Sequence, residues 1–189
     1  MLNARPPDAV RYVLAPDALR VLPHAAEGLR RLAARGFALV VITNQRGVAT
    51  GRMTMADLDR VHAALEAALA RAGVRLDALE VCPHDDGACG CRKPAPGMLL
   101  RAADRLGLDL ARSVLVGDDA RDLEAGRRAG VPLRVQLRSD GDLRAAVARL
   151  EALLDAGAAG APDAEAAGGG PGGDVLAVEV DPSWAGARA

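Results

Sequence analysis

The chain has 189 residues, a formal net charge of −1 and only one residue each of Trp, Tyr and Phe. So few aromatic side chains and so little excess positive charge argue against a surface for single-stranded nucleic acid. The N-terminus lacks a signal-peptide pattern, and no apolar run approaches the ~18 residues of a membrane span. The composition therefore predicts a cytoplasmic protein with no nucleic-acid or membrane partner.

Helical and strand patterns alternate between residues 22 and 156. The expected helices are 23–35, 54–72, 96–106, 119–129 and 140–156, and the expected strands are 37–42, 78–82, 113–116 and 133–137. This alternation indicates βαβ units and a parallel sheet, in which ligands bind beyond the carboxyl ends of the strands. We therefore expect an α/β domain over residues 1–156, with its site at one sheet edge.

The composition changes after residue 156. Residues 157–189 are rich in Ala, Gly and Pro, and most of this segment has too few large apolar residues to form a core. We expect a disordered tail, although residues 174–181 (DVLAVEVD) have the apolar pattern of a strand.

The only three cysteines lie within ten residues of one histidine. Cys82, His84, Cys89 and Cys91 form the pattern C-x-H-x4-C-x-C. Three thiolates and one imidazole make a full tetrahedral set for a structural zinc ion, with no position left for a reacting water. The alternative is a reduced surface cluster that binds metal only incidentally. The spacing in a chain without disulfide context favours zinc.

Polar residues with other chemistry follow the buried strands. Lys93 is the only lysine among 24 Lys and Arg residues, and its compact ammonium suits a phosphate or a carboxylate. Thr43 ends an apolar strand, where its hydroxyl could donate to phosphoryl oxygens or only cap a turn. Asp118 follows another strand and is a candidate Mg²⁺ ligand, whereas Asp119 is expected to cap the next helix.

Three segments in this order resemble the haloacid-dehalogenase superfamily of phosphatases: VVITNQ, CPH-x4-CxCRKPxPGML and VLVGDDxxDLEAG. They are most similar to the cap-poor branch with the D-glycero-D-manno-heptose 1,7-bisphosphate phosphatases and the histidinol-phosphate phosphatases. The resemblance implies a Rossmann-like three-layer fold, Mg²⁺, structural Zn²⁺ and hydrolysis of a phosphate monoester. It implies catalytic roles for Thr43 and Lys93. It also implies that the substrate contacts Thr43, Asn44, Arg92 and Lys93. The metal ligands that it implies are Asp118 for magnesium and Cys82, His84, Cys89 and Cys91 for zinc.

The chain departs from the family at its start. Met1-Leu2-Asn3 matches only the last three positions of the motif D-x-D-G-[TV]-[LI]-N, so both aspartates and the strand before them are missing. That strand lies at the centre of the family's sheet, between the strands that end at Thr43 and Asp118. Its loss would leave two unpaired edges inside the protein. We hypothesise that Met1 is a wrongly assigned start and that the native protein is longer.

The resemblance leads us to expect a monomeric enzyme of heptose biosynthesis that acts on a small phosphorylated sugar, heptose 1,7-bisphosphate. Histidinol phosphate is the alternative substrate, because the loop 46–53 departs from the family and has Thr50 in place of its usual arginine. A third hypothesis is a catalytically inactive zinc-binding relative, since both aspartates of the first motif are absent.

Overall fold

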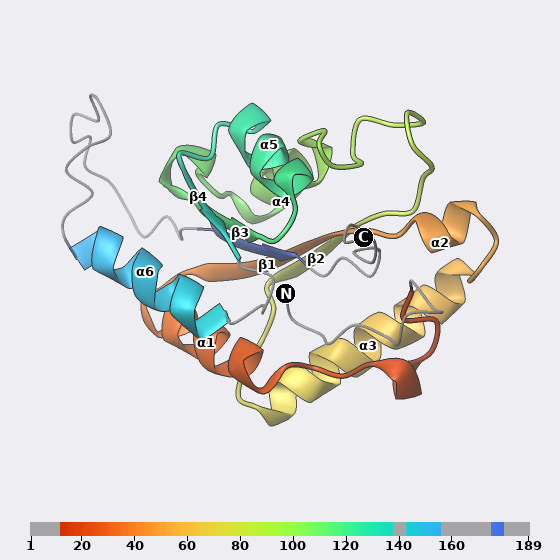
Figure 1. The fold of residues 1–189 in the computed structure, drawn as a ribbon, viewed down its shortest axis with the longest axis horizontal. Helices are drawn as coiled ribbons and strands as arrows, with labels where there is room; N and C mark the ends of the chain where they lie inside the picture. The colour runs from red at the N-terminus through yellow and green to blue at the C-terminus, as the bar shows by residue number, and fades with distance from the viewer. Residues whose placement is uncertain (1–11, 138–142, 156–174, 180–189) are drawn as a thin grey trace, which may run out of the picture.

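The computed structural model describes residues 12–137, 143–155 and 175–179, and its centre is a parallel sheet in the order β2-β1-β5-β3-β4. The strands are β1 (Ala38–Asn44), β2 (Ala78–Cys82), β3 (Val114–Gly117), β4 (Leu133–Gln136) and β5 (Val175–Glu179). The helices are α1 (Pro23–Ala34), α2 (Arg46–Ala49), α3 (Met55–Arg71), α4 (Gly97–Leu106), α5 (Ala120–Arg128) and α6 (Leu143–Asp155). Helices α4 and α5 cover one face of the sheet, and α1, α3 and α6 cover the other (Figure 1). The expected three-layer α/β fold is confirmed.

The helix boundaries follow the capping residues that the sequence contains. Thr54 begins α3 with a capping box closed by Asp57, and Asp119 begins α5 with a capping box closed by Asp122. The Asp119 cap agrees with the sequence analysis, and Thr54 lies at the start of the expected helix 54–72. The short helix α2 and the 3-10 turns η1 (Pro16–Ala18) and η2 (Leu110–Arg112) were not expected. Of the helices in the described part of the chain, none has the length and apolar character needed to span a membrane.

The core lies on both faces of β1, which explains why this strand reads as an unbroken apolar run. Leu39 and Val41 pack with α1, α3 and α6, while Val40 and Ile42 pack with α4 and α5. All four side chains are at most 1% exposed. Continuous apolar sequence is what a parallel strand with helices on both faces requires.

The position between β1 and β3 is occupied by β5, from the C-terminal end of the chain. The loss of the family's first strand would leave two unpaired edges here, and we expected a disordered tail over residues 157–189. Instead, β5 pairs in parallel with β1 on one side and with β3 on the other. The possible strand at 174–181 therefore exists as Val175–Glu179, and the part of the tail interpretation that covers these five residues is wrong. Residues 156–174 and 180–189 lie outside the described part.

Candidate functional site

The polar residues singled out in the sequence gather at the carboxyl edge of the sheet. Thr43 and Asn44 end β1, Cys82 ends β2, and Asp118 directly follows β3. Register joins the first two strand ends, because Thr43 lies opposite Val81 and Asn44 opposite Cys82. Since the strands are parallel, their ends share one edge. The fold thus brings together side chains from three separate segments.

Lys93 is a deeply buried charged group at this edge. It is only 2% exposed, and its Nζ lies 3.3 Å from Asp122 Oδ1 and 3.3 Å from the carbonyl oxygen of Ile42. Asp122 is 1% exposed, so the two charges form an ion pair inside the protein. Burial raises the pKa of the Asp122 carboxyl above its usual value. The nearby Lys93 ammonium acts in the opposite direction but does not outweigh burial. A buried ammonium held in this way is a fixed positive charge at the sheet edge.

Asn44 holds the backbone of Lys93 from the other side. The Lys93 N–H donates to Asn44 Oδ1 at 3.1 Å, and Asn44 Nδ2 donates to the Lys93 carbonyl oxygen at 3.3 Å. Both ends of the side-chain amide therefore contact one residue, 49 positions away in sequence. The geometry thus shows that Asn44 positions Lys93. The substrate contact expected for Asn44 stays a prediction.

Thr43 is fully buried, and its hydroxyl has a neighbour that the sequence analysis did not name. Gln45 Nε2 donates to Thr43 Oγ1 at 2.9 Å. The Gln45 backbone N–H donates to the Cys82 carbonyl oxygen at 2.7 Å and so ties the end of β1 to the end of β2. With its oxygen accepting from Gln45, the Thr43 hydroxyl can direct its hydrogen to a ligand oxygen. The signal for Gln45 was its place directly after the strand-end pair Thr43-Asn44.

Asp118 follows β3, and the next carboxylates organise the start of α5. Asp119 accepts from the Arg121 backbone and side chain, which holds the pKa of its carboxyl below the usual value. Asp122 Oδ2 accepts from the Asp119 N–H at 2.9 Å. Asp122 therefore closes the capping box and pairs with Lys93. The spacing G-D-D-x-x-D contained this residue, but only the fold reveals its second contact.

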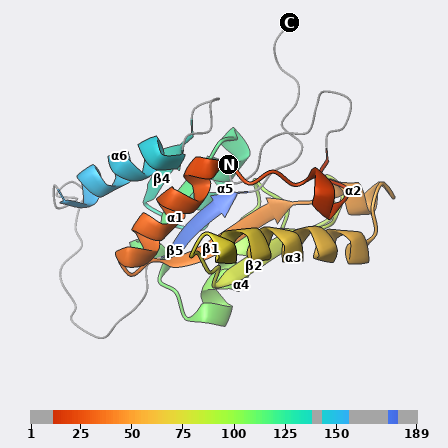
Figure 2. The same cartoon turned by 90° about the horizontal axis from the view of Figure 1, so that it is seen from below.

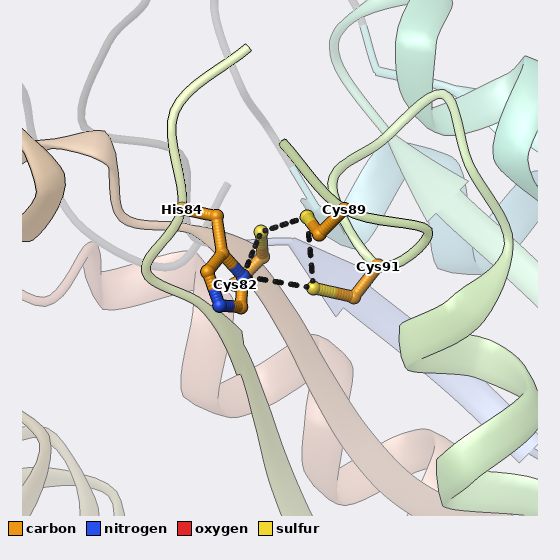
Figure 3. A group of neighbouring side chains, drawn as sticks. All are labelled: Cys82, His84, Cys89 and Cys91. Carbon is orange, nitrogen blue, oxygen red and sulfur yellow. Dashed lines mark hydrogen bonds between the residues drawn. The ribbon is translucent and has the colours of Figure 1, made fainter. Parts of the chain in front are cut away.

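The four residues of the cysteine cluster converge on one point (Figure 3). Their ligand atoms all lie within 4.8 Å of one another. Cys89 Sγ is 3.5 Å from Cys82 Sγ and 3.2 Å from Cys91 Sγ, and His84 Nδ1 is 3.4 Å from Cys91 Sγ. A tetrahedral site with Zn–S bonds of ~2.3 Å separates its sulfur atoms by ~3.8 Å. The cluster could hold a metal ion after shifts of a few tenths of an ångström.

The thiols of the cluster differ in proton affinity. Burial and hydrogen bonding with Cys91 raise the pKa of Cys82 to about 12. Burial also acts to raise the pKa of Cys89, but hydrogen bonds from Cys91 and from the backbone outweigh it and lower the pKa to about 6. All three cysteines are free rather than paired in a disulfide. A cation between the sulfur atoms would favour the thiolate at each of them.

Two arginines flank the cluster through the acidic residues of its loop. Arg92 donates to Asp86 through Nε at 2.5 Å, and Arg46 of α2 donates to Asp85 through Nε at 2.5 Å. Arg92 is 8% exposed, and its Nη1 is buried without a hydrogen-bond partner in the described part of the chain. A buried guanidinium nitrogen with a remaining donor is suited to an anionic ligand. The cysteine loop therefore fixes both Arg92 and the following Lys93.

One edge of the Rossmann-like sheet carries a fixed lysine, a strand-end hydroxyl and a strand-end carboxylate. These are the features of a hydrolase that acts on phosphate groups. The comparisons with known proteins agree. The family model of the haloacid dehalogenase-like hydrolases matches residues 3–130, and the chain belongs to this family. The resemblance stated from the sequence is confirmed.

Several relatives carry one enzyme name. The D-glycero-beta-D-manno-heptose-1,7-bisphosphate 7-phosphatase of Bordetella bronchiseptica is 42% identical over 125 residues, which cover 65% of this chain and 69% of the relative. The enzyme of the same name from Salmonella typhi is 38% identical over 136 residues, covering 68% and 72%. The crystal structure of the B. bronchiseptica D,D-heptose 1,7-bisphosphate phosphatase complexed with magnesium and phosphate has a TM-score of 0.67 and 34% identity, over 80% of this chain and 93% of that one.

Proposed function

We propose that this chain is a magnesium-dependent phosphatase that removes the 7-phosphate from D-glycero-D-manno-heptose 1,7-bisphosphate. The observation that carries the proposal is the buried Lys93, fixed by Asn44 and Asp122 beside Thr43, in a chain whose relatives bear this enzyme name. Because the Lys93 ammonium is already held in place at the edge of the sheet, it can neutralise a phosphoryl oxygen without the entropy cost of ordering the side chain first.

Each side chain of the edge has a part in binding the phosphate. The Lys93 ammonium neutralises the charge on the phosphoryl oxygens, and the Thr43 hydroxyl donates a hydrogen bond to one of them. Arg92, with its remaining donor, contacts the distal part of the sugar phosphate. The magnesium ion would add positive charge at the same oxygens, and Asp118 is the residue that we propose to hold it. A carboxylate is the ligand that this hard cation prefers.

The cysteine cluster is a structural zinc site in this proposal. Four soft or borderline ligands, Cys82, His84, Cys89 and Cys91, make a closed set that leaves no position for a substrate. Its purpose is mechanical, because Arg92 and Lys93 follow Cys91 without a gap. Zinc would hold the loop from which both cations extend. Metal analysis of the purified protein should give about one zinc per chain, and Cys89→Ser should remove it.

The substrate is tested by comparing two phosphate esters. We expect the chain with Mg²⁺ to release phosphate from heptose 1,7-bisphosphate with a higher kcat/KM than from histidinol phosphate. The reverse preference would make the chain a histidinol-phosphate phosphatase. Bound zinc without phosphate release from either ester would support the inactive relative. Arg60→Met, an exposed change on α3, serves as a control that should keep full activity.

Two further properties complete the proposal. We infer that the enzyme acts in the cytoplasm, where heptose phosphates would be its substrates, and that it is a monomer. Size-exclusion chromatography with light scattering should give the 19.4 kDa mass of one chain. A dimer mass would contradict the monomer inference and leave the proposed reaction unaffected.

A further inference from the structure

An arginine of helix α4 joins that helix to strand β2 beside the cysteine cluster. Strand β2 is at one edge of the sheet, and α4 packs on it (Figure 2). Arg101 of α4 donates through Nε to Glu80 Oε2 at 3.0 Å and through Nη2 to the Val81 carbonyl oxygen at 3.2 Å. Val81 directly precedes the candidate metal ligand Cys82. The guanidinium group therefore lies at the end of β2 where the cluster begins.

The packing of α4 on the cysteine loop brings the same guanidinium group to Cys91. The Gly97 N–H, at the start of α4, donates to the Gly90 carbonyl oxygen at 3.1 Å, and a Cβ at Gly97 would lie 3.0 Å from Cys91 Cα. Arg101 is four residues further along the helix, so it lies on the same side as Gly97. Burial acts to lower the pKa of the Arg101 guanidinium, but interactions with Glu80 and with the Cys91 thiol outweigh burial and raise it. Arg101 is thus a cationic neighbour of a candidate zinc ligand.

The charges around the cluster explain why such a cation is needed. Three thiolates outnumber the two charges of a zinc ion by one, and Cys82 and Cys91 are buried. A buried net charge is costly unless an opposite charge lies close to it. The buried Glu80 carboxylate has the opposite imbalance, because it pairs with both Arg101 and Arg105. One arginine charge is left over in this group, and it lies next to the cluster.

We propose that Arg101 is a positioning residue of the zinc site, whose guanidinium balances the charge of the Cys91 thiolate and so strengthens the binding of zinc. This inference rests on the structural zinc site of the proposed function and not on the substrate. Glu80 orients Arg101 from β2, and Arg105 supplies the second cation that the Glu80 carboxylate needs. Groups that contact metal ligands from outside commonly orient them and adjust metal affinity. Because Lys93 lies two residues after Cys91, firmer zinc binding also holds the phosphate-binding ammonium in place.

The effect on metal affinity is tested with the full chain by competition with a zinc chelator. Arg101→Met removes the charge, and Glu80 remains paired with Arg105 at 3.2 Å. We expect this variant to bind zinc at least about tenfold more weakly than the wild type. The matched control is Arg105→Met, on the same helix and at the same carboxylate, which should bind zinc like the wild type. Equal zinc affinities of the two variants would overturn the inference.

A second readout separates the charge of Arg101 from a packing role. Co²⁺ replaces zinc as the probe, and the thiolate-to-metal charge-transfer band is recorded in the absorption spectrum. Removing a cation beside a thiolate raises the energy of the sulfur electrons, so the band should move to lower energy in Arg101→Met. Arg101→Lys keeps the charge and should keep the band closer to that of the wild type, and Arg105→Met should leave it unchanged. Weaker zinc binding by Arg101→Met with an unshifted band would show a packing role only and would overturn the inference.

The outcomes separate this inference from the proposed reaction. If Arg101→Met shifts the band and weakens zinc binding while the wild-type chain hydrolyses no heptose bisphosphate, the proposed reaction fails and the role of Arg101 stands. If the wild-type chain hydrolyses heptose bisphosphate but binds no Co²⁺, or if Arg101→Met has the wild-type affinity and spectrum, the reaction stands and the role of Arg101 fails.

Discussion

Replacing Lys93 by methionine isolates the role of its charge. Methionine is also long, unbranched and flexible, so it can fill much of the same space without leaving a large cavity. It removes the ammonium that lies 3.3 Å from Asp122 Oδ1 and 3.3 Å from the Ile42 carbonyl oxygen. The Asp122 carboxylate, 1% exposed, then remains in the interior without its cation.

The structure sets the size of the expected loss. Removing one partner of a buried ion pair costs about 3–5 kcal/mol, since it leaves an uncompensated charge. Asp122 keeps one donor, the Asp119 N–H at 2.9 Å, which places the expected value near the lower end of that range. A loss of about 3 kcal/mol moves a urea midpoint by roughly 1.5 M if the m-value is about 2 kcal/mol/M.

The loss should depend on pH with a defined sign. Burial already raises the pKa of Asp122 above 3.8, and Lys93 opposes this rise, so its removal raises the folded-state pKa further. A carboxyl group whose pKa is higher in the folded than in the unfolded state does not lower the free energy of unfolding at pH values below its unfolded pKa. As the pH rises from the unfolded to the folded pKa, the group lowers the free energy of unfolding by an increasing amount. Lys93→Met should therefore be destabilised more at pH 7.5 than at pH 5.

The assay is urea unfolding at both pH values, with two companion variants. Arg60→Met removes an exposed ion pair with Asp57 and should cost less than about 1 kcal/mol at either pH. Lys93→Met/Asp122→Asn removes the buried charge, keeps an acceptor for the Asp119 N–H and should recover much of the loss. If Lys93→Met costs no more than Arg60→Met and shows no pH dependence, the buried ion pair is not what holds Lys93.

Three further changes test other parts of the structure. Gly97→Ala should weaken zinc retention in a chelator competition. A Cβ at this position would overlap the Gly90 carbonyl oxygen and would lie 3.0 Å from Cys91 Cα. The control is Gly90→Ala, which should bind zinc like the wild type because its Cβ meets nothing within 4 Å. Equal zinc retention in the two variants would show that the loop does not depend on this close approach. Thr54→Ala should lower the free energy of unfolding by about 1 kcal/mol, since it removes the α3 capping box, and an unchanged urea midpoint would contradict that role. Asn44→Ala should reduce kcat and leave zinc content unchanged, since its amide positions the Lys93 backbone; wild-type kcat would refute this positioning.

The sequence predicted the strands and helix starts because apolar patterns and capping residues act over only a few neighbouring positions. The buried run around Val40 and Val41 indicated a strand covered on both faces, and Thr54 and Asp119 marked two helix starts; the structure agrees on all of these. The strand ends at Thr43, Cys82 and Asp118 were placed at one edge by the general geometry of parallel sheets. The four metal-ligand candidates lie within ten residues, so their spacing alone made a cluster plausible.

Contacts between distant segments were not accessible in the same way. Asn44 and Lys93 are 49 positions apart, and nothing in either local pattern shows that one side-chain amide holds the other residue's backbone. Asp122 is one of the carboxylates of the segment VLVGDDxxDLEAG, and its contact with Lys93 depends on how α5 packs on the sheet. The strand β5 was recognisable as an apolar segment, but parallel pairing is non-local and the pattern does not name the neighbours. These are the points at which the fold adds to the sequence.

The most direct test of the proposed function is a ³¹P NMR time course of the 189-residue chain with D-glycero-D-manno-heptose 1,7-bisphosphate and Mg²⁺. The account predicts loss of the 7-phosphate signal, growth of inorganic phosphate and a persistent 1-phosphate, with no change when EDTA replaces Mg²⁺. Unchanged substrate signals in the presence of Mg²⁺, from a folded and zinc-loaded chain, would contradict the proposed activity.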